Sequence, residues 1–146
     1  MTRLARVGSD RVAGHLDDPS AALPAIAHEL DSASRITADH LRRSLAAVAS
    51  PLIVDVRGDD ERAAGAIAGS LHIPLAQLPG RIAEIPRDHP IVLHCAGGHR
   101  SSIAASVLRR AGHTDVSDLL GGYAAWVHQG EQAGQRGGSA AIRYRS

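Results

Sequence analysis

Short apolar segments that alternate with helical segments constrain the fold of this chain more than any other feature. Leu52–Val56 and Ile91–His94 are almost continuously apolar, and each has the length of a strand that is covered on both faces. Before the first of them, Ala38–Val48 carries apolar residues at helical spacing. This alternation predicts an α/β three-layer fold, with a mainly parallel central sheet of about five strands and helices on both faces.

The remaining elements follow the same alternation. The predicted α/β domain begins near Arg35 and Ile36, and Thr37 is expected to cap its first helix. Further strands are expected at Ser70–Pro74 and Asp115–Leu119, and further helices at Asp59–Ala64, Leu75–Ile85, Ser101–Ala111 and Gly121–His128. In a parallel sheet of this kind the site is expected at the carboxyl ends of the strands, where Asp55 and Cys95 fall.

The length of 146 residues fits one domain with flanking segments. We interpret residues 1–34 as an N-terminal flank, residues 35–130 as the domain and residues 131–146 as a flexible C-terminal tail. Within the flank, Asp17-Asp-Pro-Ser20 is expected to form a turn and a helix cap, with a helix over Ala21–Leu30.

The composition restricts the partners and the compartment. The net charge is +1, and no dense arginine run is interleaved with aromatic residues, so a nucleic-acid partner is not expected. No segment approaches about 18 consecutive apolar residues, so we expect no membrane span and no membrane partner. The N-terminus lacks the apolar core of a signal peptide, and the single cysteine cannot form an internal disulfide, so a cytoplasmic protein is favoured.

The only cysteine lies where the Ile91–His94 strand is expected to end, before a glycine-containing loop and a helix. After Cys95, the loop and the start of the helix comprise Ala96, Gly97, Gly98, His99, Arg100 and Ser101. Free N–H groups at the helix start face the loop, and the two glycines can turn further amides toward one point because they lack a Cβ atom. These dipoles and the Arg100 charge favour a thiolate, or a persulfide anion. We therefore predict that Cys95 is a nucleophile and not an inert core thiol.

Four further features occur in order along the chain, namely Leu52–Arg57 followed by Glu61 and Gly65, Gly69–Pro74, Cys95–Ser101, and Leu120–Trp126. Together, these segments resemble the signatures of the rhodanese (thiosulfate:cyanide sulfurtransferase) family. One departure is Gly65-Ala-Ile-Ala-Gly69, where family members usually have Gly-His-Ile-Pro-Gly. The resemblance covers residues 35–130 and implies a rhodanese-like fold with Cys95 as the residue that carries sulfur.

The resemblance also implies a double-displacement mechanism. The Cys95 thiolate would attack the outer sulfur of thiosulfate or another persulfide donor, and cyanide or a thiol would then take the sulfur from the Cys95 persulfide. Arg100, together with His99 and Arg57, would attract the anionic donor, and Asp55 would brace the loop. The implied partners are small sulfur-containing anions and thiol acceptors, with a protein sulfur donor or acceptor as a further candidate.

Several alternatives stay open at this point. Arg57 and Glu61 could simply pair with each other, because they are four residues apart. A persulfide carrier or protein-interaction module would use the same loop without turning over small donors. A phosphatase or arsenate reductase of the related fold is a lesser alternative, because the related phosphatases have a loop one residue longer than the Cys-x4-Arg spacing from Cys95 to Arg100.

No cofactor and no metal are expected. Neither a Gly-x-Gly-x-x-Gly motif nor a Walker loop occurs, and the histidines lack the paired spacing of a zinc site.

The N-terminal flank repeats part of the pattern of the domain at a constant offset of 104 residues. The matching positions are Leu4-Ala-Arg-Val-Gly8, Val12 and Leu16 against Leu108-Arg-Arg-Ala-Gly112, Val116 and Leu120. We interpret residues 4–30 as the tail of a preceding, related unit, with chance similarity as the alternative. The flank also resembles the junction in bacterial proteins that fuse a metallo-β-lactamase-like domain to rhodanese units.

Overall fold

The computed structural model describes residues 17–24 and 33–139, without the side chains of Ala22 and of residues 132–139. The chain divides into two units, residues 1–32 and residues 33–146. In the first unit, α2 (Pro19–Ala22) begins after Asp18, whose carboxylate accepts hydrogen bonds from the amides of Ser20 and Ala21. The predicted helix cap is therefore confirmed, whereas residues 4–16 and 25–30 of the predicted flank lie outside the described residues.

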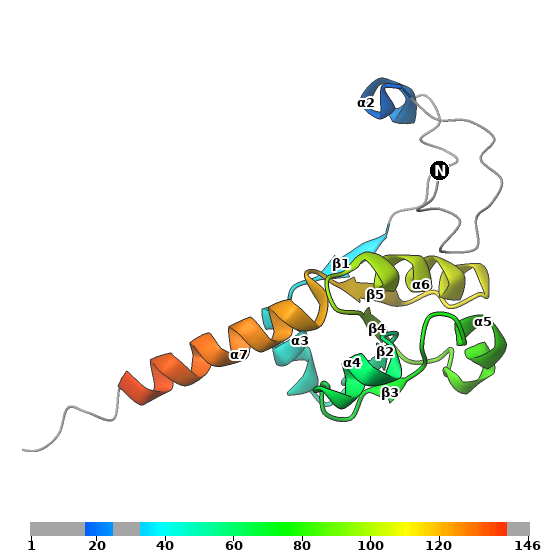
Figure 1. Ribbon diagram of the computed structural model, residues 1–146. Helices are drawn as coiled ribbons and strands as arrows, with labels where there is room; N and C mark the ends of the chain where they lie inside the picture. Colours follow the sequence, from blue (N-terminus) through cyan, green and yellow to red (C-terminus); the bar gives the residue numbers. More distant parts are fainter. Residues whose placement is uncertain (1–16, 25–32, 140–146) are drawn as a thin grey trace, which may run out of the picture. The chain divides into compact units, whose positions relative to one another are not determined.

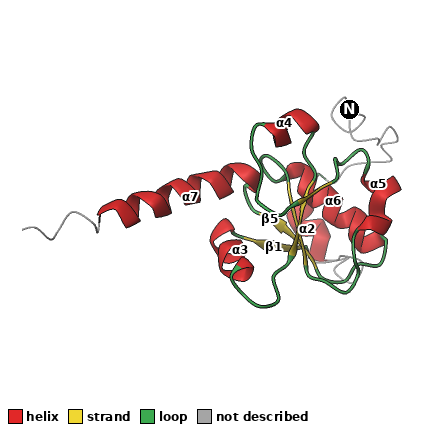
Figure 2. Ribbon diagram, turned by 90° about the horizontal axis from the view of Figure 1, so that it is seen from below, coloured by secondary structure: helices red, strands yellow, loops and turns green. Residues whose placement is uncertain are grey.

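The second unit is built on a sheet of five strands in the order β1-β5-β4-β2-β3 (Figure 1). Figure 2 shows the strands in yellow, with red helices around them. The strands are β1 (Ser34–Ile36), β2 (Leu52–Asp55), β3 (Leu71–His72), β4 (Ile91–His94) and β5 (Val116–Leu119). Every neighbouring pair runs parallel, and β4 lies in the middle of the sheet, between β5 and β2. The predicted parallel sheet of about five strands is thus confirmed.

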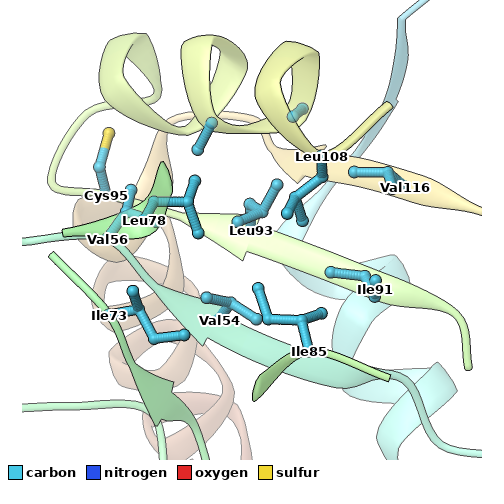
Figure 3. Packing of buried hydrophobic residues seen from close by; sticks show 12 residues of the cluster. Val54, Val56, Ile73, Leu78, Ile85, Ile91, Leu93, Cys95, Leu108 and Val116 are labelled. Atoms are coloured by element: carbon cyan, nitrogen blue, oxygen red, sulfur yellow. The ribbon is translucent and has the colours of Figure 1, made fainter. Parts of the chain in front are cut away.

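Helices cover both faces of the sheet, because successive strand residues point to opposite sides. They are α3 (Ala38–Leu45), α4 (Asp59–Ala63), α5 (Leu78–Arg81), the 3-10 helix η2 (Ile82–Glu84), α6 (His99–Arg110) and α7 (Gly122–Ser139). Val54 and Leu93 belong to the core cluster that includes buried residues of α5 and α6 (Figure 3). Their neighbours Ile53 and Val92 belong to a second cluster with residues of α3 and α7. The predicted three layers are therefore present.

Helix α2 begins at Pro19, two residues before the predicted start at Ala21, and in the second unit α5 and α6 also begin away from their predicted limits. The predicted helix Leu75–Ile85 is a short α5 followed by η2, because Pro79 is tolerated only in the first turn of a helix and so fixes where α5 starts. Helix α6 begins at His99 and not at Ser101, because Gly98 forms its N-cap with φ +103°.

The last helix, α7, is longer than predicted. The sequence predicts an end at His128, but α7 continues to Ser139, with no proline in between to stop it. Residues 131–139 of the predicted C-terminal tail are therefore helical, and residues 140–146 lie outside the described residues. Of the helices in the described part of the chain, none has the length and the apolar character needed to cross a bilayer.

The start of α7 lies directly against the loop that follows β4. The Tyr123 amide donates to the Cys95 carbonyl at 2.7 Å, and the Ala124 amide donates to the Ala96 carbonyl at 3.1 Å. Gly122 has φ +58°, and a Cβ atom there would overlap the Cys95 carbonyl oxygen and lie 2.7 Å from the Ala96 oxygen. Only glycine permits this approach without strain.

We expect Gly122→Ala to lower the free energy of unfolding by about 3 kcal/mol, because the new Cβ must push the loop carbonyls away in a left-handed backbone conformation. Gly80→Ala is the matched control, since nothing lies within 4 Å of its Cβ position, and its effect should stay within about 1 kcal/mol. Urea denaturation of both variants measures the difference. Equal stability of the two variants would contradict the proposed contact.

Candidate active site

The predicted loop lies at the carboxyl end of the central strand. Cys95 follows β4 directly, the chain turns through Gly98, and α6 begins at His99. The neighbouring strand β2 ends with Asp55, which is in register with His94 of β4. The structure thus brings all the predicted site residues to one edge of the sheet, namely Asp55, Arg57 and the continuous segment Cys95, Ala96, Gly97, Gly98, His99, Arg100 and Ser101.

Backbone amides of the loop surround the sulfur of Cys95, whose residue is only 2% exposed. The Gly98 amide donates to Sγ at 3.1 Å, and the left-handed conformation of Gly98 makes this orientation possible. Burial raises the pKa of the Cys95 thiol, but hydrogen bonds from the Ser101 amide and hydroxyl lower it, with the amides of Gly98 and Gly97 contributing further. The net pKa is below that of an ordinary cysteine, so the thiolate forms more readily than in a free cysteine.

The Ser101 hydroxyl can respond to the charge of the sulfur. Its Oγ atom donates to the Gly98 carbonyl at 3.0 Å and lies 3.7 Å from Sγ. A hydroxyl carries a single proton, so it can either bond the carbonyl and accept from a neutral thiol, or turn and donate to a thiolate. This buried side chain therefore suits both protonation states of Cys95.

Arg100 does not stand free at the loop, because it forms a bidentate ion pair with Glu61. Both contacts between the two terminal nitrogens and the carboxylate oxygens are 2.6 Å long. The hydrogen bonds from Arg100 lower the pKa of Glu61 to about 2. Sequence reasoning missed this pair and considered Arg57 as the partner of Glu61. One indication of this pair was that Glu61 lies in the helix that follows β2, and that β2 is the neighbour of β4, the strand before the loop.

Asp55 and Arg57 form a buried pair that supports the loop indirectly. Arg57 donates to the Asp55 carboxylate from Nε at 2.9 Å and from Nη2 at 2.7 Å, and also to the carbonyls of Glu61 and Gly65. Its guanidinium lies 4.1 Å from the ring centre of Tyr123, whose amide holds the Cys95 carbonyl. Asp55 therefore acts on the loop through Arg57 and Tyr123, and Arg57 is 3% exposed with its donors directed at protein groups.

His94 is a buried neighbour of the nucleophile. Its Nε2 atom lies 3.7 Å from Asp55 Oδ2, and its ring is stacked with that of Tyr123 at a centroid distance of 6.1 Å. Burial lowers the pKa of His94, despite the opposing charge of Asp55. The imidazole is therefore neutral at pH 7 and adds no net charge next to Cys95. Within the described residues, no group of three or more His, Cys, Asp or Glu side chains is arranged to hold a metal ion.

The parallel sheet, the loop after its central strand and the amides that face one sulfur atom define a class of α/β proteins with a cysteine nucleophile in an anion-binding loop. Residues 37–129 match the Rhodanese-like domain family, and the chain belongs to this family. The resemblance of the four sequence segments is thereby confirmed.

The relatives of this chain include named sulfurtransferases. It is 36% identical over 97 residues to a sulfurtransferase of Allochromatium vinosum, a match that covers 66% of this chain and 91% of that protein. It is 32% identical over 101 residues to the human thiosulfate:glutathione sulfurtransferase, covering 60% of this chain and 88% of the human protein. The solution structure of the rhodanese-like domain of the Anabaena protein Alr3790 matches with a TM-score of 0.62 and 31% identity, covering 68% of this chain and 76% of that one.

We expect the Cys95 thiol to titrate below the pH at which a free cysteine does, because hydrogen bonds from the loop stabilise the thiolate. In Ser101→Ala the hydroxyl is lost while the amide stays, so the midpoint should move to higher pH. The ultraviolet absorbance of the thiolate, followed against pH with Cys95→Ser as the blank, measures both midpoints. Identical midpoints in wild type and Ser101→Ala would show that the hydroxyl does not act on the sulfur.

Proposed function

We propose that this protein is a sulfurtransferase that moves sulfane sulfur from thiosulfate, or another persulfide donor, to cyanide or a thiol through a persulfide on Cys95. The observation that carries the proposal is the set of amides directed at Sγ, which stabilises a negative charge on sulfur. The names of the relatives support the same reaction class, and the human relative is named for both thiosulfate and glutathione.

The first half-reaction loads the cysteine. The Cys95 thiolate attacks the outer sulfur of thiosulfate, a bond forms between Sγ and that sulfur, and the sulfur–sulfur bond of the donor breaks. Its electron pair leaves with sulfite. The negative charge then lies on the outer sulfur of the Cys95 persulfide, about 2 Å from Sγ. The amides of Gly97, Gly98 and Ser101 and the start of α6 attract this charge.

The proposed roles of the charged residues follow from their partners. Glu61 accepts one hydrogen bond from each terminal nitrogen of Arg100, so an anionic donor can bond only to the remaining N–H groups of this side chain, which also interacts with the Cys95 sulfur. Asp55 is a positioning residue, since it holds Arg57 beneath Tyr123. His99 is exposed at the start of α6, where it faces incoming solutes.

The proposed place of action is the cytoplasm. Cys95 is free, and the reaction needs it as a thiol at the start of each cycle. The cytosol keeps thiols reduced, and thiols that can take the sulfur from the Cys95 persulfide are abundant there.

Incubation with thiosulfate should add the mass of one sulfur atom to the chain, and cyanide should remove it. Cys95→Ser should gain nothing, because the serine hydroxyl is not a nucleophile for sulfane sulfur in this site. Intact-protein mass spectrometry measures both steps, with circular dichroism to show that Cys95→Ser stays folded. No added mass on wild type, under conditions that load a known rhodanese, would overturn the proposal. Loading without transfer to cyanide or a thiol would instead indicate a carrier.

We further expect no hydrolysis of para-nitrophenyl phosphate. The four residues between Cys95 and Arg100 form a loop centred on one sulfur atom, with the Gly98 amide already 3.1 Å from Sγ. A phosphate group needs a wider loop and a free arginine, and Arg100 is paired with Glu61. Release of nitrophenol above the rate of Cys95→Ser would contradict this reading of the loop.

A further inference from the structure

A pocket of about 440 Å³ lies beside the loop, on the side of strands β1 and β5. Its lining residues are Ala33, Arg35, Gly97, Gly98, His99, Ser102 and Asp118. Gly97 and Gly98 also direct amides toward the Cys95 sulfur. The backbone of these two glycines is therefore a wall shared by the pocket and the sulfur site.

Arg35 presents a fixed cation to this pocket. Its Nε and Nη2 atoms bond to the carboxylate of Asp118 at 3.1 to 3.3 Å, and Asp118 is 0% exposed. The Arg35 side chain is 45% exposed, and its Nη1 atom makes no hydrogen bond with any residue that the structure describes. Asp118 thus holds the guanidinium in place while one edge with two N–H donors stays available.

The other two arginines next to the loop are already engaged. Arg57 is buried and donates to Asp55 and to two carbonyls, and Arg100 has both terminal nitrogens on Glu61. Among the three, Arg35 is the one that lines the pocket, and its Nη1 atom has no hydrogen-bond partner among the residues that the structure describes. Planar guanidinium edges of this kind bind carboxylates with charge-assisted hydrogen bonds.

The distance between Arg35 and the sulfur suits a small molecule. The Gly98 amide nitrogen lies 3.1 Å from Sγ, and a Cβ atom on Gly98 would lie 3.8 Å from Arg35 Nη2. With the two covalent bonds between these points, the sulfur and the guanidinium are at most about 10 Å apart. Because the two glycines lie between these points, a thiol whose carboxylate is a few bonds from its sulfur would reach from Arg35 to the outer sulfur of the persulfide across the loop at Gly97, which is exposed.

We propose that the pocket binds the carboxylate of the sulfur acceptor, so that the acceptor is a low-molecular-weight thiol with a carboxylate near its sulfur, recognised by Arg35. This inference rests on the proposed sulfurtransferase function. In the transfer step, the acceptor thiolate attacks the outer sulfur of the Cys95 persulfide, and a new sulfur–sulfur bond forms. The bond to Sγ breaks, its electron pair returns to Sγ, and the negative charge of the persulfide stays on the transferred sulfur, so that the acceptor leaves as a persulfide anion and Cys95 as a thiolate.

The test compares two acceptors that differ in the carboxylate charge and in one methyl group, 3-mercaptopropionate and its methyl ester. Wild type is loaded with sodium polysulfide, so that the thiosulfate step does not enter, and the loss of persulfide is followed by mass spectrometry after each acceptor is added. After correction for thiolate fraction, we expect the second-order rate constant of the acid to exceed that of the ester about tenfold, as one charge-assisted hydrogen bond provides. Added salt should reduce this advantage.

The variant Arg35→Gln/Asp118→Asn removes the guanidinium without leaving a buried charge unpaired. In this variant, we expect the rate constant of the acid to fall about tenfold, to that of the ester. The rate constant of the ester should change less than about twofold between the variant and wild type. Arg81→Gln is the matched control, because it removes an arginine from an exposed pair with Glu84, outside the pocket. It should leave the acid-to-ester ratio unchanged.

The outcomes separate this inference from the function on which it rests. If wild type accepts sulfur from polysulfide and the acid is no faster than the ester, the pocket assignment is overturned while the sulfurtransferase function stands. The wild-type comparison decides this even if the double variant does not fold. If wild type forms no persulfide with polysulfide or thiosulfate, the proposed function fails and the acceptor assignment fails with it.

Discussion

The conformation of the four residues from Cys95 to Gly98, in which backbone amides face one sulfur atom, is the constraint on which the rest of the site depends. Such a loop is unfavourable without support, since its carbonyls must point away from the sulfur and find donors elsewhere. The amides of Tyr123 and Ala124 supply those donors. The close approach that they need explains why α7 begins with Gly122. The last helix is therefore part of the active site, although it contributes no side chain to the sulfur.

The electrostatics of the site depend on the backbone as well as on paired cations. Arg57, Arg100 and Arg35 lie around the loop, and each is held by one carboxylate, from Asp55, Glu61 and Asp118 respectively. Asp55 also pairs with Arg62, so these groups keep a small positive excess, and Arg100 interacts with the Cys95 sulfur. The oriented amides and the start of α6 add to this attraction for negative charge on sulfur. A site of this kind stabilises one extra sulfur atom at short range without a strong long-range field for polyanions. This agrees with the net charge of +1.

The parts of the fold that are local in sequence could be predicted from it. Apolar runs identify β2 and β4, and the glycines between Cys95 and α6 identify the loop, because burial and backbone freedom depend on residue type. The pairs Glu61–Arg100 and Arg35–Asp118 join residues 39 and 83 positions apart. They depend on strand order, which places β1 beside β5 and β2 beside β4. Charge alone does not distinguish Arg57 from Arg100 as the partner of Glu61, so the sequence left that pairing open.

The first and last residues of the helices also could not be predicted from the sequence. The start of α6 at His99 depends on the left-handed conformation of Gly98, and glycine permits that conformation without requiring it. The end of α7 could not be predicted for a similar reason, because its glycines permit a loop but do not require one, and the helix continues to Ser139.

The central claim is that Cys95 accepts one sulfur atom covalently and holds it as a persulfide in the amide-lined loop. Sulfite release measures this most directly, because sulfite leaves only when the sulfur–sulfur bond of thiosulfate breaks. With thiosulfate and no acceptor, we predict a single burst of one sulfite per chain, absent in Cys95→Ser. No burst, or continuous release of sulfite without an acceptor, would contradict the account.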